Sequence, residues 1–281
     1  MARSDDGSPV LVLGGTGKTG RRVAAQLAGR GQRAVTASRS GQRRFDWHSK
    51  ATWEPAVAGV RAAYLVDSQT PEAAALMGEF SRVAVAAGVR RLVLLSARAW
   101  EQAGDEAGFA VERAVQDSGA AWTVLRPTWF AQNFSEEAFL RDAVAAGRVE
   151  LPAGAGRDPF IDAEDIAACA AAALVEDGHE GAVYALSGPR AMTFGDCVAE
   201  IASATGRDLT YVPVTPEEYV THLLGRGYDK EFAAFAAELV GSIAGNAGDY
   251  LSDGVHRLLG RAPRDFAQYV RDTAPSGVWQ G

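Results

Sequence analysis

Seven residues near the start of the chain have the composition and spacing of a phosphate-binding loop. They satisfy the pattern GxxGxxG and run Gly14, Gly15, Thr16, Gly17, Lys18, Thr19, Gly20. Glycine permits a tight turn and a close backbone approach to a pyrophosphate, and a following helix N-terminus offers unpaired N–H groups. The loop lies between an apolar run, Pro9 to Leu13, and a helical pattern, Lys18 to Arg30. This position favours a dinucleotide cradle over the alternative, a tight turn without a ligand, and Lys18 stands too early for a Walker loop.

A basic cluster after the second apolar run bears on which dinucleotide would bind. A carboxylate at this point grips the ribose hydroxyls of NAD, but here the residues are Ser38, Arg39 and Ser40, followed by Arg43 and Arg44. Arg39 is placed to pair with a 2′-phosphate, and Ser38 or Ser40 to hydrogen-bond it. In an acidic chain this cluster favours NADP(H) over NAD(H). The alternative is a solvated basic loop.

The elements that must position these residues alternate along the first half of the chain. Continuous apolar runs are separated by helical patterns, and the further runs lie at 33–37, 62–66, 91–95 and 121–125. Continuous rather than alternating apolar strands indicate a parallel sheet that is covered on both faces. The predicted fold is therefore of the α/β class, a doubly wound parallel Rossmann sheet.

Beyond Pro127 the pattern becomes glycine- and proline-rich and then mainly helical, apart from a strand pattern at 183–186. We expect a Rossmann-type dinucleotide-binding region at 1–134 and a smaller, mainly helical substrate cap at 135–281. Segments at about 159–187 are expected to return to the Rossmann core.

Composition and charge narrow the class of protein. The 281 residues are 47% hydrophobic and 22% charged, which is typical of a globular chain. A net charge of −7 counts against a nucleic acid or an anionic membrane as partner. Cys169 and Cys197 fit no zinc pattern, so we expect no metal. With no signal segment or membrane span expected, the chain is predicted to be cytoplasmic, a monomer or homodimer with a small-molecule substrate.

The chain resembles the NmrA-like branch of the atypical short-chain dehydrogenase/reductases almost end to end. The resemblance is carried by the segments 12–20, 45–47, 122–134 and 159–167. Within that branch it looks most like bacterial relatives of the ergot-alkaloid reductases, which deliver hydride from NADPH to an iminium carbon. The resemblance implies further contacts with the cofactor. These place Asp46 and Trp47 beside the adenine, and Val66, Asp67 and Ser68 beside the nicotinamide-side ribose.

The catalytic pattern of the wider superfamily is only partly present. Its members use a Ser or Thr after the strand ending here at Leu95, then a Tyr-x-x-x-Lys pair on the next helix. Ser96 matches the first position, where it would hydrogen-bond a carbonyl or the nicotinamide, or else cap the strand. The Tyr and Lys positions fall near Gly104 and Gly108, and no Tyr or Lys occurs at 91–126. Alcohol dehydrogenation by this mechanism is therefore not expected.

An aromatic segment after the last of these strands is the candidate substrate pocket, because ligands of such sheets bind at the carboxyl ends of strands. The expected pocket residues are Trp100, Thr128, Trp129, Phe130, Gln132 and Asn133. For Phe134, packing between sheet and cap is an equal alternative. From the cap, Tyr219 and His222 are candidate proton donors, with a structural role as the alternative for each.

Three carboxylates at the start of the alanine-rich helix, Asp162, Glu164 and Asp165, could form an acid–base pair. Their position at a helix start instead favours capping and stabilisation of the helix dipole.

The sequence as a whole predicts an NADPH-dependent reductase of secondary metabolism, acting on a small cyclic or aromatic electrophile such as an iminium, quinone or enone. Two alternatives stay open. One is a non-catalytic NADP(H) redox sensor of the NmrA type, which binds a protein partner. The other is a cyclase, isomerase or dehydratase that keeps the dinucleotide as a structural cofactor.

Overall fold

The structure, a computed structural model, describes residues 7–41 and 43–280. The chain divides into two compact units. The sheet unit comprises Met1–Pro127, Ala163–Leu186 and Asp253–Arg261, and the helical unit comprises Thr128–Asp162, Ser187–Ser252 and Ala262–Gly281. The first boundary therefore falls after Pro127 and not after Phe134, and the return of 253–261 to the sheet unit was not expected from the sequence.

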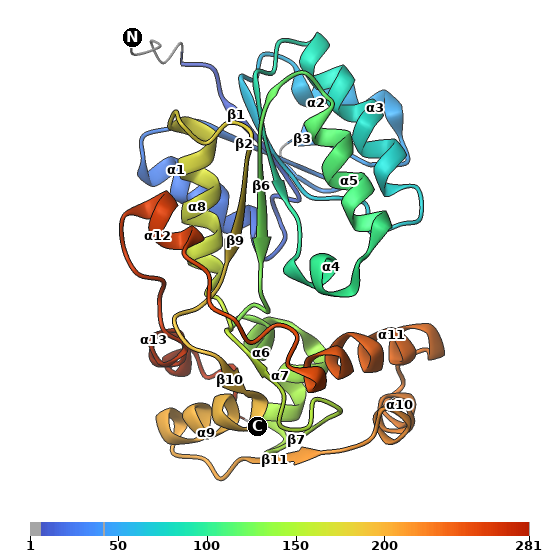
Figure 1. Cartoon of the computed structure of the whole chain (residues 1–281), viewed down its shortest axis with the longest axis vertical. Coiled ribbons are helices and arrows are strands. Elements are labelled where there is room, and N and C mark those ends of the chain that lie inside the picture. Colours follow the sequence, from blue (N-terminus) through green and yellow to red (C-terminus); the bar gives the residue numbers. More distant parts are fainter. Residues whose placement is uncertain (1–6, 42, 281) are drawn as a thin grey trace. The chain divides into compact units, whose positions relative to one another are not determined.

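The sheet unit is built on a seven-stranded sheet in which every neighbouring pair is parallel (Figure 1). In spatial order the strands are β3 Arg43–Arg44, β2 Ala34–Ser38, β1 Val10–Leu13, β4 Ala62–Leu65, β5 Arg91–Leu95, β6 Ala121–Pro127 and β9 Ala182–Leu186. The predicted doubly wound parallel sheet is confirmed.

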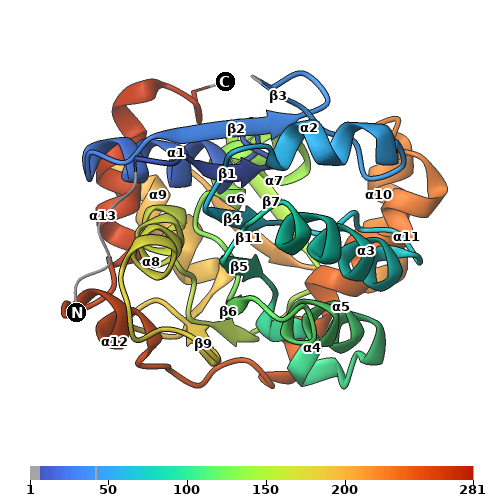
Figure 2. The same ribbon diagram turned by 90° about the horizontal axis from the view of Figure 1, so that it is seen from above.

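Helices cover both faces of this sheet, which is why its strands are continuously apolar. Figure 2 shows α1 (Gly20–Gly29) and α8 (Ala163–Val175) on one face, and α3 (Ala73–Ala86) and α5 (Glu106–Gln116) on the other. All residues of β1 and β4 are buried. The alanine-rich sequence of α8 follows from its position, since the helix is buried almost all round and small side chains let it approach the sheet closely.

Two short elements of the sheet unit were not expected from the sequence. The strand β3 consists of two arginines, so no apolar pattern marks it. Helix α4 is only six residues long and ends at Gly104, which has a left-handed φ of 61°. The remaining elements of the unit are η1 Lys50–Thr52, α2 Trp53–Val57, α4 Arg98–Ala103 and α12 Gly254–Leu259.

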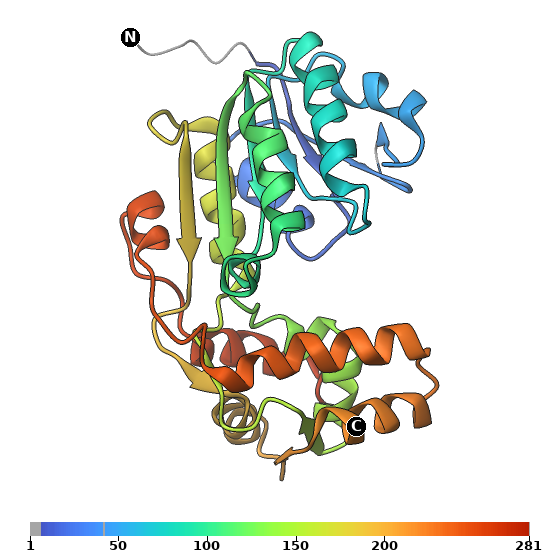
Figure 3. The ribbon, with the colours of Figure 1, turned by 45° about the vertical axis from the view of Figure 1, so that its right-hand side comes forward.

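Strands β6 and β9 lie side by side although some sixty residues separate them (Figure 3). Helix α12 packs against β9 through a close backbone approach, because a Cβ at Gly254 would lie 2.1 Å from the carbonyl oxygen of Ala185. This approach fixes the late segment 253–261 to the sheet.

The helical unit has its own core. Its strands form two small pairs, parallel β7–β11 and antiparallel β8–β10. The bounds are α6 Asn133–Glu136, α7 Ala138–Ala145, β7 Arg148–Leu151, β8 Arg157–Asp158, β10 Met192–Thr193, α9 Phe194–Thr205, β11 Thr210–Pro213, α10 Pro216–Gly225, α11 Lys230–Gly241, η2 Ser242–Gly245, α13 Phe266–Thr273 and η3 Ala274–Ser276.

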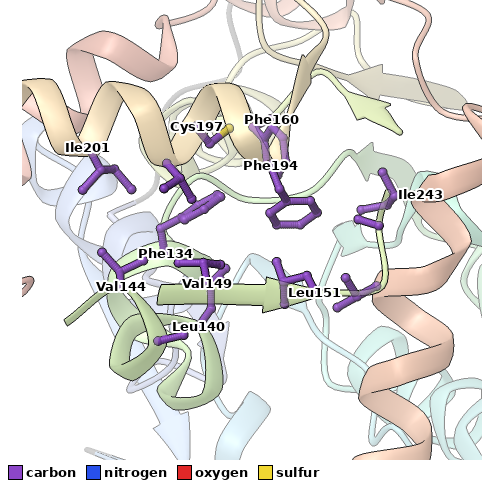
Figure 4. Packing of buried hydrophobic residues seen from close by; sticks show 14 of the residues in the cluster. Phe134, Leu140, Val144, Val149, Leu151, Phe160, Phe194, Cys197, Ile201 and Ile243 are labelled. Atoms are coloured by element: carbon purple, nitrogen blue, oxygen red, sulfur yellow. The ribbon is translucent and has the colours of Figure 1, made fainter. Parts of the chain in front are cut away.

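Phe134 lies in the middle of this core, together with Phe160 and Phe194 (Figure 4). The buried indole of Trp279 donates a hydrogen bond to the carbonyl oxygen of Phe134 at 2.7 Å. Of the two roles considered for Phe134, the structure supports packing, here within the core of the helical unit. Within the described residues, none of the helices combines the length and the apolar character that crossing a membrane requires.

Candidate functional site

The strand order reverses direction between β1 and β4, so the loops that follow these two strands flank the topological switch point of the sheet. Ligands of doubly wound sheets bind in the crevice at this point. The glycine loop follows β1, and the segment 66–68 follows β4. The two loops are in close contact, because a Cβ at Gly14 would lie 3.0 Å from Cγ2 of Val66.

The glycines of the loop are required by sterics as well as by any ligand. A Cβ at Gly15 would lie 2.4 Å from Cβ of Thr36, and one at Gly20 would lie 2.2 Å from the carbonyl oxygen of Gly14. Gly14 itself has a φ of 62° and accepts a hydrogen bond from the N–H of Gly17 at 2.8 Å. The loop is thus a tight turn in which side chains are excluded at three positions.

The same turn leaves space for an anion. Thr16 and Gly17 are exposed, Lys18 is half-buried, and the first turn of α1 contains no acidic residue. The N-terminal end of a helix carries unpaired N–H groups and a positive partial charge. The residues present therefore fit the pyrophosphate of a dinucleotide.

Thr19, one of the residues of the glycine loop, has a side chain that is bonded within the protein. It is buried, and its Oγ1 accepts a hydrogen bond at 3.0 Å from the hydroxyl of Tyr64, which lies in β4. Burial also raises the pKa of Tyr64, so this hydroxyl stays protonated. The side chain of Thr19 joins the start of α1 to the sheet, and contact of Thr19 with a phosphate stays a prediction.

At the end of β2 the basic residues have different environments. The side chain of Arg39 is exposed and forms no ion pair with any residue that the structure describes. Arg43 instead donates hydrogen bonds to the carbonyl oxygens of Ala56 and Ala58 at 2.8 and 2.9 Å, so it holds β3 against α2. Ser38 Oγ accepts a hydrogen bond at 3.3 Å from the N–H of Ser40. Contact of Arg39 with a 2′-phosphate stays a prediction.

The two residues expected beside the adenine both contribute to local structure. Trp47 packs edge-to-face on Phe45 and Phe80, with ring centroids 5.0 and 5.4 Å apart. Asp46 Oδ1 accepts a hydrogen bond at 3.0 Å from the N–H of His48. These contacts hold the loop after β3 in place, and contact with an adenine stays a prediction.

The segment after β4 contains a partly buried carboxyl group. Burial raises the pKa of Asp67 above its ordinary value of 3.8, although the N–H groups of Asp67 and Gln69 offset part of this shift by hydrogen bonding. Gln69 has a φ of 54°, which is uncommon for a residue other than glycine. Ser68 and Thr70 share a hydrogen bond of 2.8 Å. A perturbed carboxyl group beside a strained residue is typical of functional sites.

Ser96 lies just beyond β5 and is part of a buried network that the sequence did not reveal. Its hydroxyl donates a hydrogen bond at 2.5 Å to Oε1 of Glu112 in α5. Arg126 of β6 contacts both oxygens of the same carboxylate, at 2.9 Å from Nε and 2.6 Å from Nη2. The one available signal was an acidic residue at a position that faces inward on α5.

Trp100, an expected pocket residue, packs against a neighbouring helix. Its indole packs on α5, where a Cβ at Gly108 would lie only 2.3 Å from the ring. The side chain is part of the hydrophobic packing of the sheet unit. Trp100 is half-buried, and contact of its exposed part with a substrate stays a prediction.

Several expected pocket residues of the helical unit are bonded within that unit. Thr128 Oγ1 donates to the carbonyl oxygen of Pro159 at 2.7 Å, and Gln132 Nε2 donates to Oδ1 of Asp162 at 2.7 Å. Both side chains are buried. Gln132 and Thr128 thus contribute to the structure of the unit, and contact of either with a substrate stays a prediction.

The aromatic part of the same segment is less deeply buried. Trp129 is half-buried and packs edge-to-face on Phe194, with ring centroids 5.7 Å apart. Phe130 forms a bridge with Ile161 through its backbone. Asn133 is also half-buried and begins α6. Contact of Trp129, Phe130 or Asn133 with a substrate stays a prediction.

The two candidate proton donors lie together on α10. Nδ1 of His222 pairs with Glu150 of β7. The hydroxyl of Tyr219 is buried without a hydrogen-bond partner among the described residues, and burial raises its pKa, which makes it a weaker acid. Both residues line a cavity of about 10 Å³, room for roughly one water molecule. These surroundings favour structural roles for both.

The three carboxylates at the start of α8 each have a partner. Asp162 accepts from Gln132, as described above. Glu164 pairs with Arg22 at 3.0 Å, and the fully buried Asp165 pairs with Arg261 at 2.7 Å. These contacts support the structural interpretation over an acid–base pair.

Comparison with known proteins agrees with this geometry. No protein-family model matches the chain. The uncharacterized oxidoreductase YesF of Bacillus subtilis is 31% identical over 280 residues, covering 97% of this chain and 96% of its own. Festuclavine synthase I of Penicillium roqueforti is 32% identical over 279 residues, covering 93% and 96%. The Citrobacter triphenylmethane reductase, solved with NADP(H), has the same fold with a TM-score of 0.81, at 21% identity and 95% and 99% coverage.

The fold, the position of the glycine loop and these relatives together define the class. The chain belongs to the NmrA-like branch of the atypical short-chain dehydrogenase/reductases.

Proposed function

We propose that the protein is an NADPH-dependent reductase that delivers hydride to a small electrophile, an iminium, quinone or enone, in secondary metabolism. The observation that carries this proposal is the glycine loop at the switch point of the sheet, with the exposed Arg39 at the end of the adjacent strand. The relatives support it, since one is a festuclavine synthase and others are named agroclavine dehydrogenase and NAD(P)H azoreductase. An Escherichia coli quinone oxidoreductase of the same fold was solved with NADPH.

Different residues of the sheet unit would bind different parts of NADPH. The loop 14–20 would receive the pyrophosphate at the N-terminus of α1, and Arg39 would pair with the 2′-phosphate. Val66 and Ser68, after β4, would contact the ribose on the nicotinamide side. NADPH, when bound, supplies a hydride, and the two electrons that move with it reduce the substrate.

The surroundings of α5 favour electrophiles that need no strong acid. The positions expected for the superfamily's Tyr and Lys fall near Gly104 and Gly108, and the ring of Trp100 lies against Gly108. An iminium carbon becomes an amine on accepting hydride, with no proton required. A quinone or enone also takes up one proton, which water can supply. The protein then acts by positioning the reactants.

A stopped-flow experiment tests this proposal. The protein with bound NADPH, confirmed by nicotinamide fluorescence, is mixed with iminium salts, quinones and enones. We expect rapid loss of the absorbance of reduced nicotinamide with at least one class. Binding without oxidation by any electrophile would contradict the reductase and favour a redox sensor or a non-redox enzyme. Absence of binding would contradict the assignment of the glycine loop.

A further inference from the structure

The hydroxyl group of Ser96 has a fixed orientation. The N–H of Ser96 donates to the carbonyl oxygen of Leu125 at 2.8 Å, which holds the backbone against β6. The hydroxyl donates to Oε1 of Glu112 at 2.5 Å. Both side chains are buried, with 5% and 2% of their residues' surfaces exposed. The position lies directly beyond the carboxyl end of β5, the edge of the sheet at which such folds bind ligands.

The side chain of Glu112 accepts three hydrogen bonds. Oε1 accepts from Ser96 Oγ and from Nε of Arg126, and Oε2 accepts from Nη2 of Arg126. The hydrogens of two of these bonds belong to Arg126, because a guanidinium group has no acceptor, and Ser96 Oγ donates the third. The contact with Glu112 also raises the pKa of Arg126, so the cation is retained. A serine proton lost to a substrate could therefore not be replaced from Glu112.

Arg126 is itself held from two further directions. Nη1 lies 3.3 Å from Oε2 of Glu101, and the guanidinium group lies over the ring of Phe109, 5.2 Å from its centroid. Arg126 is thus fixed by α4 and α5 and fixes Glu112 in turn. A two-point arginine–carboxylate contact leaves the carboxylate little freedom to rotate.

We propose that Glu112 is a positioning residue that holds the Ser96 hydroxyl proton away from the ligand, so that Ser96 meets its ligand only as a hydrogen-bond acceptor. Two lone pairs remain on Ser96 Oγ, and these accept an N–H or O–H. As regards turnover, this inference rests on the proposed reductase function. The orientation of the Ser96 hydroxyl then affects substrate preference. Carbonyl substrates that need a hydrogen bond from this serine are disfavoured relative to electrophiles that need none.

Neutron diffraction from deuterium-exchanged crystals tests the orientation without any turnover. We expect a deuteron on Ser96 Oγ that points at Glu112 Oε1. A deuteron on Glu112, or one on Ser96 that points away from it, would overturn the proposal. NADPH affinity of Ser96→Ala gives a second readout that is independent of turnover. Loss of one accepted hydrogen bond is expected to weaken binding by about three- to tenfold.

Two variants test the specificity. Ser96→Ala leaves the Glu112–Arg126 pair intact, and we expect equal losses of the enone and iminium rates, with their ratio within about threefold of wild type. The double variant Glu112→Leu with Arg126→Leu removes the buried pair as a unit, which folded proteins often tolerate. It frees the serine proton, and the ratio of enone to iminium rate is expected to rise about tenfold. Glu101→Gln, which alters a contact of Arg126 but none of Ser96, is the control with an unchanged ratio.

Each remaining result is decisive. A selective loss of enone reduction in Ser96→Ala would show that Ser96 donates in the wild type and would overturn the proposal. The proposal is also overturned if Ser96→Ala changes neither NADPH affinity nor either rate, because Ser96 would then face no ligand. If the wild-type protein oxidises NADPH with none of the electrophiles tested, the proposed reductase function is wrong. The neutron map and the NADPH affinity of Ser96→Ala still decide the role of Ser96 in that case.

Discussion

The indole of Trp100 lies directly against the Cα of Gly108. A Cβ at this glycine would come within 2.3 Å of the ring, so no other residue fits without displacing Trp100. Trp100 is in α4 and Gly108 is in the first turn of α5. The sequence pattern places the superfamily's lysine near this glycine, and the packing of Trp100 leaves no space for a side chain on Gly108 itself.

This contact predicts an unusual result for a glycine-to-alanine change in a helix. Gly108→Ala should destabilise the protein by about 1–3 kcal/mol, because overpacking outweighs the better helix propensity of alanine. The measurement is the free energy of unfolding in urea.

Gly78 in α3 provides the matched control for Gly108. A Cβ there would meet only Cβ of Ala114, at an ordinary 3.7 Å. Gly78→Ala should therefore stabilise the protein by about 0.5–1 kcal/mol. Equal effects of the two substitutions would contradict the packing of Trp100 on α5.

The glycine loop predicts a selective loss of nucleotide binding. Gly20→Ala places a Cβ 2.2 Å from the carbonyl oxygen of Gly14, so the turn must open. We expect NADPH affinity to fall by about tenfold or more, equivalent to about 1.4 kcal/mol. Gly29→Ala, at the other end of α1 and with open space around the new Cβ, should leave the affinity unchanged. Fluorescence titration measures both, and a normal affinity in Gly20→Ala would argue against this loop as the cradle.

The preference for NADPH over NADH should depend on Arg39. Arg39→Asp removes the charge that pairs with the 2′-phosphate and should weaken NADPH about tenfold more than NADH. Arg33→Asp makes the same charge change at the opposite end of β2, also on an exposed side chain, and should affect the two nucleotides equally. Dissociation constants for both nucleotides are needed. Equal losses in Arg39→Asp would refute the 2′-phosphate assignment.

The raised pKa of Asp67 predicts a pH-dependent effect on stability. Because burial raises this pKa above 3.8, the folded state binds the proton more tightly than the unfolded state does. The contribution of Asp67 to stability is therefore most favourable at low pH and declines as pH rises through 3.8 towards the folded value. The asparagine in Asp67→Asn does not titrate. The free energy of unfolding of this variant, relative to that of the wild type, should therefore increase as pH rises.

Asp196 should show the opposite sign. A hydrogen bond from the backbone N–H of Thr193 holds the pKa of Asp196 below 3.8. Its stabilising effect is present above 3.8 and is lost as pH falls through the folded value. The free energy of unfolding of Asp196→Asn, relative to that of the wild type, should therefore decrease as pH rises. Urea unfolding across this range measures both variants, and a pH-independent difference for Asp67→Asn would disprove its raised pKa.

The sequence by itself determined the sheet and the nucleotide loop, because both depend on local pattern. Continuous apolar runs placed β1, β4, β5 and β6 within a residue or two, since strands covered on both faces are apolar throughout. The GxxGxxG spacing located the tight turn between β1 and α1, because the steric need for glycine is a property of the turn itself. The arginine-only strand β3 was not predicted because it has no such pattern.

Only the tertiary structure decided which side chains meet. Ser96 follows β5, Glu112 lies on α5 and Arg126 lies on β6, and their contact depends on how α5 packs on the sheet. Likewise, the sequence shows Gln132 only as a polar residue that could contact a ligand. In the fold, its Nε2 lies 2.7 Å from Oδ1 of Asp162. The hydrophobic periodicity of the sequence predicts whether a position is buried, but it does not predict which group a buried polar side chain bonds to. The partner is set by packing between segments that are distant in the chain.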